Sequence, residues 1–126
     1  MIENLFRGKR KYAPGWVVGN LVEFPSGRAK ILVWNRADLE FDEIEVIPDT
    51  VGQYCCVVDR NKQMIFEGDI LEFELYGVHF VGYVDFSGGR ISVICDDGGP
   101  YLDDVILHHG AAKIGNIHDN PELIEI

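Results

Sequence analysis

The histidines and cysteines of this 126-residue chain are its first candidates for metal binding or catalysis. His108 and His109 are neighbours, so on a strand their side chains point to opposite faces and do not readily share one metal ion. The other candidates have neither a C-x-x-C nor an H-x₃-H spacing: Cys55, Cys56, Cys95 and His118. The sequence therefore predicts no metal site.

Two acidic pairs, Asp96-Asp97 and Asp103-Asp104, surround a Gly-Gly-Pro segment. A Ca²⁺ ion takes roughly six to eight oxygen ligands, usually from alternating positions, and this spacing matches no such loop. We interpret these four residues as a solvated acidic face: Asp96, Asp97, Asp103 and Asp104.

His118 and Asp119 have the residue types of an acid–base couple. Adjacent side chains rarely aim at each other, however, and Asn116 and Asn120-Pro121 on either side favour turn geometry. The chain contains no Gly-rich phosphate loop, nucleophile elbow or Cys–His protease spacing. We therefore expect a protein that is not an enzyme, with no catalytic residues and no cofactor.

Charge is distributed unevenly along the chain, whose net charge is -10. Residues 1–36 carry +5, residues 37–62 carry -5 and residues 63–126 carry -10. The acidic excess argues against non-specific binding of residues 63–126 to nucleic acid or anionic membrane, and leaves residues 1–36 open. Screening limits attraction between exposed charges to about 8 Å at physiological salt. A basic cluster near the start is a candidate interaction face that would dock closely on acidic surface of this chain or a neighbour: Arg7, Lys9, Arg10 and Lys11.

Strand signals dominate the segments that must position these residues. Apolar segments joined by turn residues predict three hairpins: Val17–Phe24 with Ala29–Trp34, Tyr54–Val58 with Met64–Phe66, and Phe80–Phe86 with Arg90–Cys95. Gly68–Gly77 alternates apolar and acidic residues, the pattern of a strand with one buried face. Val105–Leu107 and Lys113–Ile117 read as further short strands. In the turn at 59–63, we expect Asn61 to adopt a positive φ.

Residues 39–46 allow two interpretations. Their apolar residues fit one face of a helix, or a strand with a bulge at Asp42-Glu43, which we prefer. Asn120-Pro121-Glu122-Leu123 has the cap and the Pro of a single helical turn.

An internal similarity links Val18–Arg28 with Val81–Arg90, one residue shorter. Each copy has a Gly (Gly19, Gly82) where another backbone would come close in a hairpin, which suggests two related β-units. The predicted fold is mostly β and barrel-like, with short antiparallel hairpins and at most one or two short helical turns. We expect an N-terminal β-hairpin subdomain at residues 1–50 and a C-terminal β-barrel subdomain at residues 51–126, able to pack as one domain.

The composition also bears on the cellular location. The longest apolar stretch, Tyr54–Val58, is far shorter than the ~20 residues that span a bilayer. Residues 1–20 lack the apolar core of a secretory signal. Cys55 and Cys56 are adjacent, so a bridge between them would be strained. We expect reduced thiols and a cytoplasmic protein.

Five blocks of the chain match a known pattern in order: Phe6–Lys9 with Gly15–Val17, Thr50–Tyr54, Asp59–Lys62, Ile65–Ile70 and Ile114–Leu123. Together they resemble the YopX family, small proteins found in phages and prophages. The resemblance implies a β-rich fold with a small, SH3-like barrel in the C-terminal part, and a bacterial host. It implies no settled activity and supplies no catalytic residues.

The chain departs from that pattern in three places. Family members usually carry Gly where Lys62 stands and a Thr-Gly pair near Cys55-Cys56. Tyr12-Ala13-Pro14 replaces a polar Asp-Asn-Gly stretch.

Glu67-Gly68-Asp69 is similar to the turn that opens a strand in SH3-like barrels, and we interpret it as structural.

Our leading functional hypothesis is a non-enzymatic β-rich module that binds protein, including itself as a homo-oligomer. Edge strands and the charge polarity motivate it. The alternative is a role with nucleic acid. In one form the basic segment and Phe6, Tyr12 and Trp16 contact single-stranded DNA or RNA. In the other the acidic C-terminal half imitates DNA and occupies a DNA-binding protein. A small enzyme is the third class.

Overall fold

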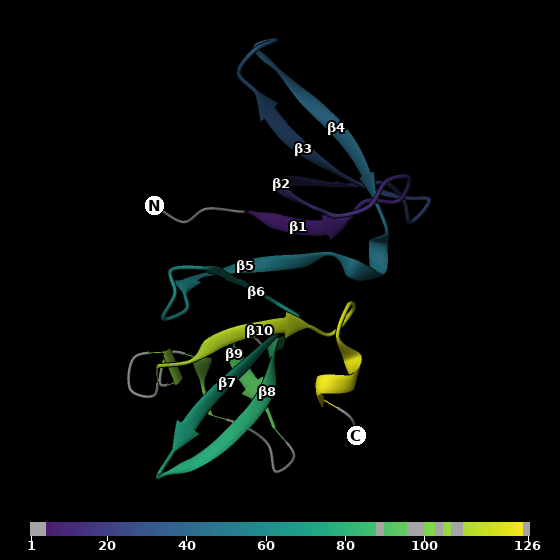
Figure 1. Ribbon diagram of the computed structural model, residues 1–126. Coiled ribbons are helices and arrows are strands. Elements are labelled where there is room, and N and C mark those ends of the chain that lie inside the picture. Colours follow the sequence, from purple (N-terminus) through teal and green to yellow (C-terminus); the bar gives the residue numbers. More distant parts are fainter. Residues whose placement is uncertain (1–4, 88–89, 96–99, 103–104, 107–109, 125–126) are drawn as a thin grey trace. The chain divides into compact units, whose positions relative to one another are not determined.

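The strands form two antiparallel sheets, in a chain that the computed structural model divides into two compact units, Met1–Tyr54 and Cys55–Ile126 (Figure 1). The structure describes residues 5–87, 90–95, 100–102, 105–106 and 110–124. The division expected from the sequence, after residue 50, lies just before this boundary.

The strands of the N-terminal unit are arranged in the order β4-β3-β2-β1-β5. Its inward side chains, which include Val17, Ala29, Ile31 and Val46, form one hydrophobic core. A 3₁₀ turn, η1, connects the fourth strand to the fifth. The elements are β1 (Phe6–Lys9), β2 (Trp16–Glu23), β3 (Ala29–Asn35), β4 (Glu40–Val46), η1 (Pro48–Thr50) and β5 (Gly52–Val58), which continues into the second unit.

The start of the chain lies beside the end of β4. Arg10 forms a bridge with Val46, and the N–H groups of Lys11 and Ile47 donate to Glu45 O at 3.1 Å and Lys9 O at 2.8 Å. Gly8 allows this approach, because a Cβ at that position would lie 2.8 Å from the Val46 side chain.

Residues 39–46 contain the preferred strand, but the bulge expected at Asp42-Glu43 is wrong. The pairing of β3 with β4 runs without a shift from Ala29↔Val46 to Asn35↔Glu40. Ile44 is paired with Ile31 on the core side, whereas Phe41 is paired with Trp34 on the opposite face. Phe41 is out of phase with Ile44 because its side chain is exposed on the opposite face of the strand. The pattern therefore requires no bulge residue.

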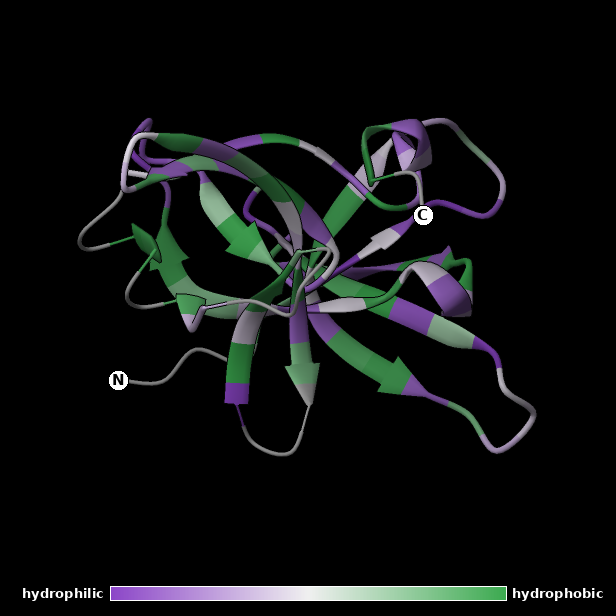
Figure 2. Cartoon of the chain, turned by 90° about the horizontal axis from the view of Figure 1, so that it is seen from below, coloured by the Kyte–Doolittle hydropathy of each residue, from purple (hydrophilic) through white to green (hydrophobic). Residues whose placement is uncertain are grey.

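The C-terminal unit has a four-stranded sheet in the order β10-β7-β8-β9, and β6 is next to β5 in the other sheet. Hydrophobic and hydrophilic residues alternate along several strands (Figure 2). The hydrophobic side of these strands buries Leu71, Phe73, Val84 and Val93. The elements are β6 (Met64–Phe66), β7 (Asp69–Leu75), β8 (Val78–Ser87), β9 (Arg90–Ile94), β10 (Ala112–Asn116) and a 3₁₀ turn, η2 (Pro121–Ile124).

All three predicted hairpins are present, as are the strands predicted within Gly68–Gly77 and at Lys113–Ile117 and the terminal helical turn. Two details are wrong. Lys62, at φ 67°, has the positive φ expected for Asn61. Val105 does not lie in a strand, since its N–H donates to Tyr101 O four residues back, as in one turn of helix.

The predicted small SH3-like barrel is not seen, because the described strands form two open sheets and no closed barrel.

The two glycines of the internal similarity have the role that the sequence predicts. A Cβ on Gly19 would lie 2.2 Å from Leu32 O, and one on Gly82 would lie 2.7 Å from Ile94 O. Each hairpin therefore requires Gly where the neighbouring strand comes closest.

Candidate functional site

The basic cluster near the start of the chain does not form one exposed face. Arg7 is only 7% exposed and its guanidinium lies 4.8 Å from the centre of the Trp16 ring. Lys9 and Arg10 are half-buried, and Lys11 is exposed. The four residues therefore belong to different surroundings within the N-terminal unit.

Acids of β4 neutralise several bases of residues 1–36. Arg28 Nη2 lies 2.6 Å and Lys11 Nζ 3.3 Å from the Glu45 carboxylate. Lys30 Nζ lies 3.4 Å from Glu43 Oε1. Hydrogen bonding from Arg28, with help from Lys11, lowers the pKa of Glu45 to about 2, against the opposing effect of burial. The complementarity expected between a basic segment and acidic surface is thus present within this unit, for these three bases.

The outer face of the β3–β4 hairpin carries an apolar surface that sequence reasoning missed. Trp34 and Phe41 are 49% and 52% exposed, and their rings meet edge to face with centroids 5.1 Å apart. Leu39, in the connecting turn, is 74% exposed and has a φ of 53°. We call Trp34 and Phe41 the aromatic patch. The signal that could have revealed it is the phase of Phe41, opposite to that of Ile44 and Val46.

The aromatic residues proposed to contact nucleic acid are distributed differently. Phe6 packs against the N-terminal core and Trp16 is half-buried against Arg7. Tyr12 is 78% exposed, with Lys11 Nζ 5.5 Å from its ring. They do not form a row of three exposed rings. The predicted acidic face, Asp96, Asp97, Asp103 and Asp104, lies outside the described residues, as do His108 and His109.

A hydrogen-bonded junction centred on Asp59 connects segments of the C-terminal unit. Asp59 Oδ1 accepts the N–H groups of Asn61 and Gln63 at 2.9 Å, and its Oδ2 accepts that of Lys113, also at 2.9 Å. Burial alone would raise the pKa of Asp59, but these three donors and the Lys113 charge lower it below its ordinary value.

Lys113 extends the same junction to β6 and β7. Its Nζ donates to Met64 O at 2.7 Å and lies 3.3 Å from the carboxylate of Asp69, which is fully buried. Asp69 also accepts the N–H of Phe66 at 2.7 Å. The strands β10 and β7 also pair directly, with Gly115 opposite Ile70 and Asn116 opposite Asp69, so the blocks Ile65–Ile70 and Ile114–Leu123 are in contact.

The terminal block forms a turn. Asn116 Oδ1 accepts the backbone N–H groups of both His118 and Asp119 at 3.0 Å. Asn120 N–H donates to Asn116 O at 2.8 Å, and a Cβ on Gly115 would lie 2.5 Å from Asn120 Oδ1. These contacts account for the Gly-Asn and Asn-Pro positions that flank His118.

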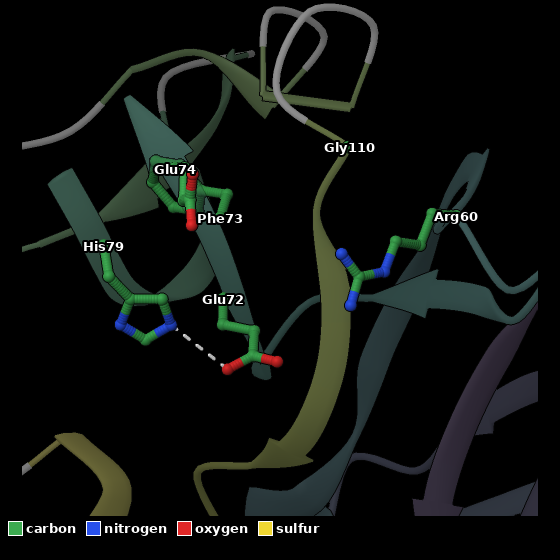
Figure 3. Close-up of a pocket in the computed structure, with 6 residues that line it drawn as sticks. All are labelled: Arg60, Glu72, Phe73, Glu74, His79 and Gly110. Atoms are coloured by element: carbon green, nitrogen blue, oxygen red, sulfur yellow. Dashed lines mark hydrogen bonds and ion pairs between the residues drawn. The ribbon is translucent and has the colours of Figure 1, made fainter. Parts of the chain in front are cut away.

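An open hollow of about 450 Å³ lies in the C-terminal unit, lined by Arg60, Glu72, Phe73, Glu74, His79 and Gly110. His79 Nε2 is 3.2 Å from Glu72 Oε2, on β8 and β7 respectively, and both side chains are exposed to water. Figure 3 shows Glu72, Glu74 and His79 on one side and Arg60 across β10. His79 and Glu72 are within hydrogen-bond distance of each other, with the role of the imidazole nitrogen set by its tautomer.

Within the described part of the chain, no group of three or more His, Cys, Asp or Glu side chains could hold a metal ion. Over the same residues, no helix has the length and apolar character needed to cross a bilayer.

Comparison with known proteins places these features in a family. No curated protein matches the chain. The family model described as YopX protein matches residues 5–125, nearly the whole chain. The chain therefore belongs to the YopX family.

Proposed function

We propose that this YopX-family chain is a phage- or prophage-type protein that acts without catalysis, as a module that binds protein and also associates with itself. The cytoplasm of a bacterial host is its proposed location. The observation that carries the proposal is the aromatic patch, where two half-exposed rings stand on a continuously paired hairpin. Contiguous exposed apolar side chains of this kind are typical of protein-binding surfaces.

The charges along the β3–β4 hairpin favour a protein partner over nucleic acid. Lys30, on the strand that carries Trp34, is paired with Glu43, and Arg28 is paired with Glu45. Binding to phosphates draws on uncompensated positive charge, which these ion pairs reduce. The proposed partner is a protein segment that presents apolar side chains between charges of both signs.

Paired comparison of variants tests this surface. Immobilised wild-type chain, the double variant Trp34→Ala/Phe41→Ala and the control Tyr12→Ala are exposed to lysate of infected or lysogenic cells. Retained proteins are then quantified. We expect a protein held by wild type and by the control and lost from the double variant. An identical set of proteins on all three would contradict the proposed surface.

Nucleic acid is the competing partner, and titration separates the two. Fluorescence anisotropy with a single-stranded DNA oligonucleotide at low salt is expected to show no saturable binding. Binding that is lost in the Trp34→Ala/Phe41→Ala variant would replace the protein partner by nucleic acid, since half-exposed rings can also stack on bases. Imitation of DNA by the acidic half has no support among the described residues.

Charge reversal in the basic cluster would not be a clean test of self-association. Arg7 is packed on Trp16 and Lys11 is paired with Glu45, so reversal at either position would disturb the N-terminal unit itself. A test of self-association needs residues outside these contacts.

A further inference from the structure

The tip of the β7–β8 hairpin presents an unusual side chain. Tyr76 is 98% exposed, with a φ of 53°, and Gly77 follows with a φ of 79°. Leu75 and Val78 pair on either side, so these two residues are the whole turn. Positive φ at both central positions suits Asn-Gly, and a Tyr in the first is strained. Neither the turn geometry nor burial within the unit favours this aromatic side chain.

The hollow has the size and chemistry to receive a tyrosine side chain. Its volume, about 450 Å³, lies within the range of roughly 300–1,000 Å³ typical of ligand pockets. The guanidinium of Arg60 can stack on an aromatic face, and the carboxylates of Glu72 and Glu74 can accept a phenol O–H (Figure 3).

The tip and one wall of the hollow lie on the same hairpin. Glu74 pairs with His79 immediately behind the Leu75–Val78 pair, and both residues line the hollow. A two-fold axis near this pair would bring each Tyr76 to the hollow of the other copy. Two-fold contacts are reciprocal and use one surface twice, as this arrangement does. The hollow also carries charges of both signs, which can face each other across such an axis.

We propose that Tyr76 of one copy inserts into the hollow of a second copy, between Arg60 and the Glu72–Glu74 side of β7, and that the exchange is reciprocal. This inference rests on the proposed self-association and names the surface responsible for it. The occupant is a second copy because Tyr76 and the hollow are neighbours on one surface, and a reciprocal two-fold contact uses one surface twice.

Analytical ultracentrifugation of the full chain tests the contact with two single variants. Tyr76→Asn removes the ring and suits the positive φ, so the variant is expected to fold at least as well as wild type. Arg60→Ala removes one wall of the hollow. Each is expected to weaken self-association at least tenfold, whereas Tyr12→Ala, an exposed tyrosine of the other unit, leaves it unchanged.

Mixing the two variants gives a result that general destabilisation would not produce. The Tyr76→Asn variant keeps an intact hollow, and the Arg60→Ala variant keeps Tyr76. A mixed pair therefore retains one of the two reciprocal contacts, Tyr76 of one copy in the hollow of the other. We expect the mixture to associate more tightly than either variant alone. If both variants associate like wild type, or if mixing restores nothing, the inference is wrong while self-association stands. If wild type remains monomeric at every concentration, both proposals fail.

Discussion

Asp59 accepts the backbone N–H of Lys113 through Oδ2 at 2.9 Å, and this bond joins the 59–63 turn to β10. The same carboxylate holds the turn through Asn61 and Gln63, so one buried side chain organises two segments far apart in sequence. We expect Asp59→Asn to lower the free energy of unfolding by roughly 1–3 kcal/mol, because the Asn amide has one acceptor oxygen where the carboxylate uses two. Urea unfolding followed by circular dichroism measures the change. An unchanged midpoint would show that the junction does not stabilise the unit.

The pKa of Asp59 gives that junction a pH dependence. Its pKa is lowered in the folded state, so its stabilising contribution is complete above the ordinary value of 3.8 and decreases as the pH falls below it. Asp59→Asn should therefore differ from wild type most at neutral pH and least in acid. Equal differences at both pH values would contradict this assignment.

The cluster of Glu45 with Arg28 and Lys11 makes a similar prediction for the N-terminal unit. The pKa of Glu45 is lowered from 4.5 to about 2, so its contribution is complete above about pH 4.5 and is lost as the pH falls toward 2. Both tryptophans, Trp16 and Trp34, are in this unit, so their fluorescence reports its thermal unfolding. Glu45→Gln should flatten the acid dependence of the unfolding temperature in that window. A variant that retains the full wild-type dependence would exclude Glu45 as its source.

Two non-glycine residues in β5 and the turn that follows it adopt a positive φ, which Gly adopts without strain. Lys62 has a φ of 67° and Cys56 a φ of 64°. Lys62→Gly should raise the free energy of unfolding by roughly 0.5–1 kcal/mol, because Gly adopts this conformation without the clash of a Cβ. Asn61→Gly is the matched control one residue away, where no positive φ occurs, and it should not stabilise. Denaturant titration of both variants decides whether strain at Lys62 is relieved.

Gly19 is expected to tolerate no side chain. The Cβ of Gly19→Ala would lie 2.2 Å from Leu32 O, so the two strands must separate, at a cost of roughly 1–3 kcal/mol. Asn20→Ala, exposed on the neighbouring position of β2, should have little effect. Tryptophan fluorescence during urea unfolding compares the two variants, and similar midpoints would contradict the close approach.

The sequence predicts the hairpins well because their signals are local: an apolar run, a turn and a second apolar run. β1 (Phe6–Lys9) was missed because it is short and basic, and its pairing with β2 and β5 stabilises it. The positive φ at Lys62 could not be assigned because the hydrogen bonds to Asp59 determine which residue of that turn adopts it.

The surfaces proposed to bind were harder to predict than the strands. The aromatic patch depends on the register of β4 against β3, which places Phe41 outside and Ile44 inside. The hollow combines Arg60, the β7–β8 hairpin and Gly110, three segments that the sequence does not bring together by spacing. Both required the pairing of strands to be known.

Self-association is the part of the proposed function that can be tested without identifying any partner. Static light scattering after size exclusion measures the mass of the purified full chain over a wide concentration series. We predict a transition from the 14.2 kDa chain to a species of twice that mass, shifted to higher concentration by Tyr76→Asn. A mass that stays at 14.2 kDa throughout the series would contradict the central claim that this chain binds a second copy of itself.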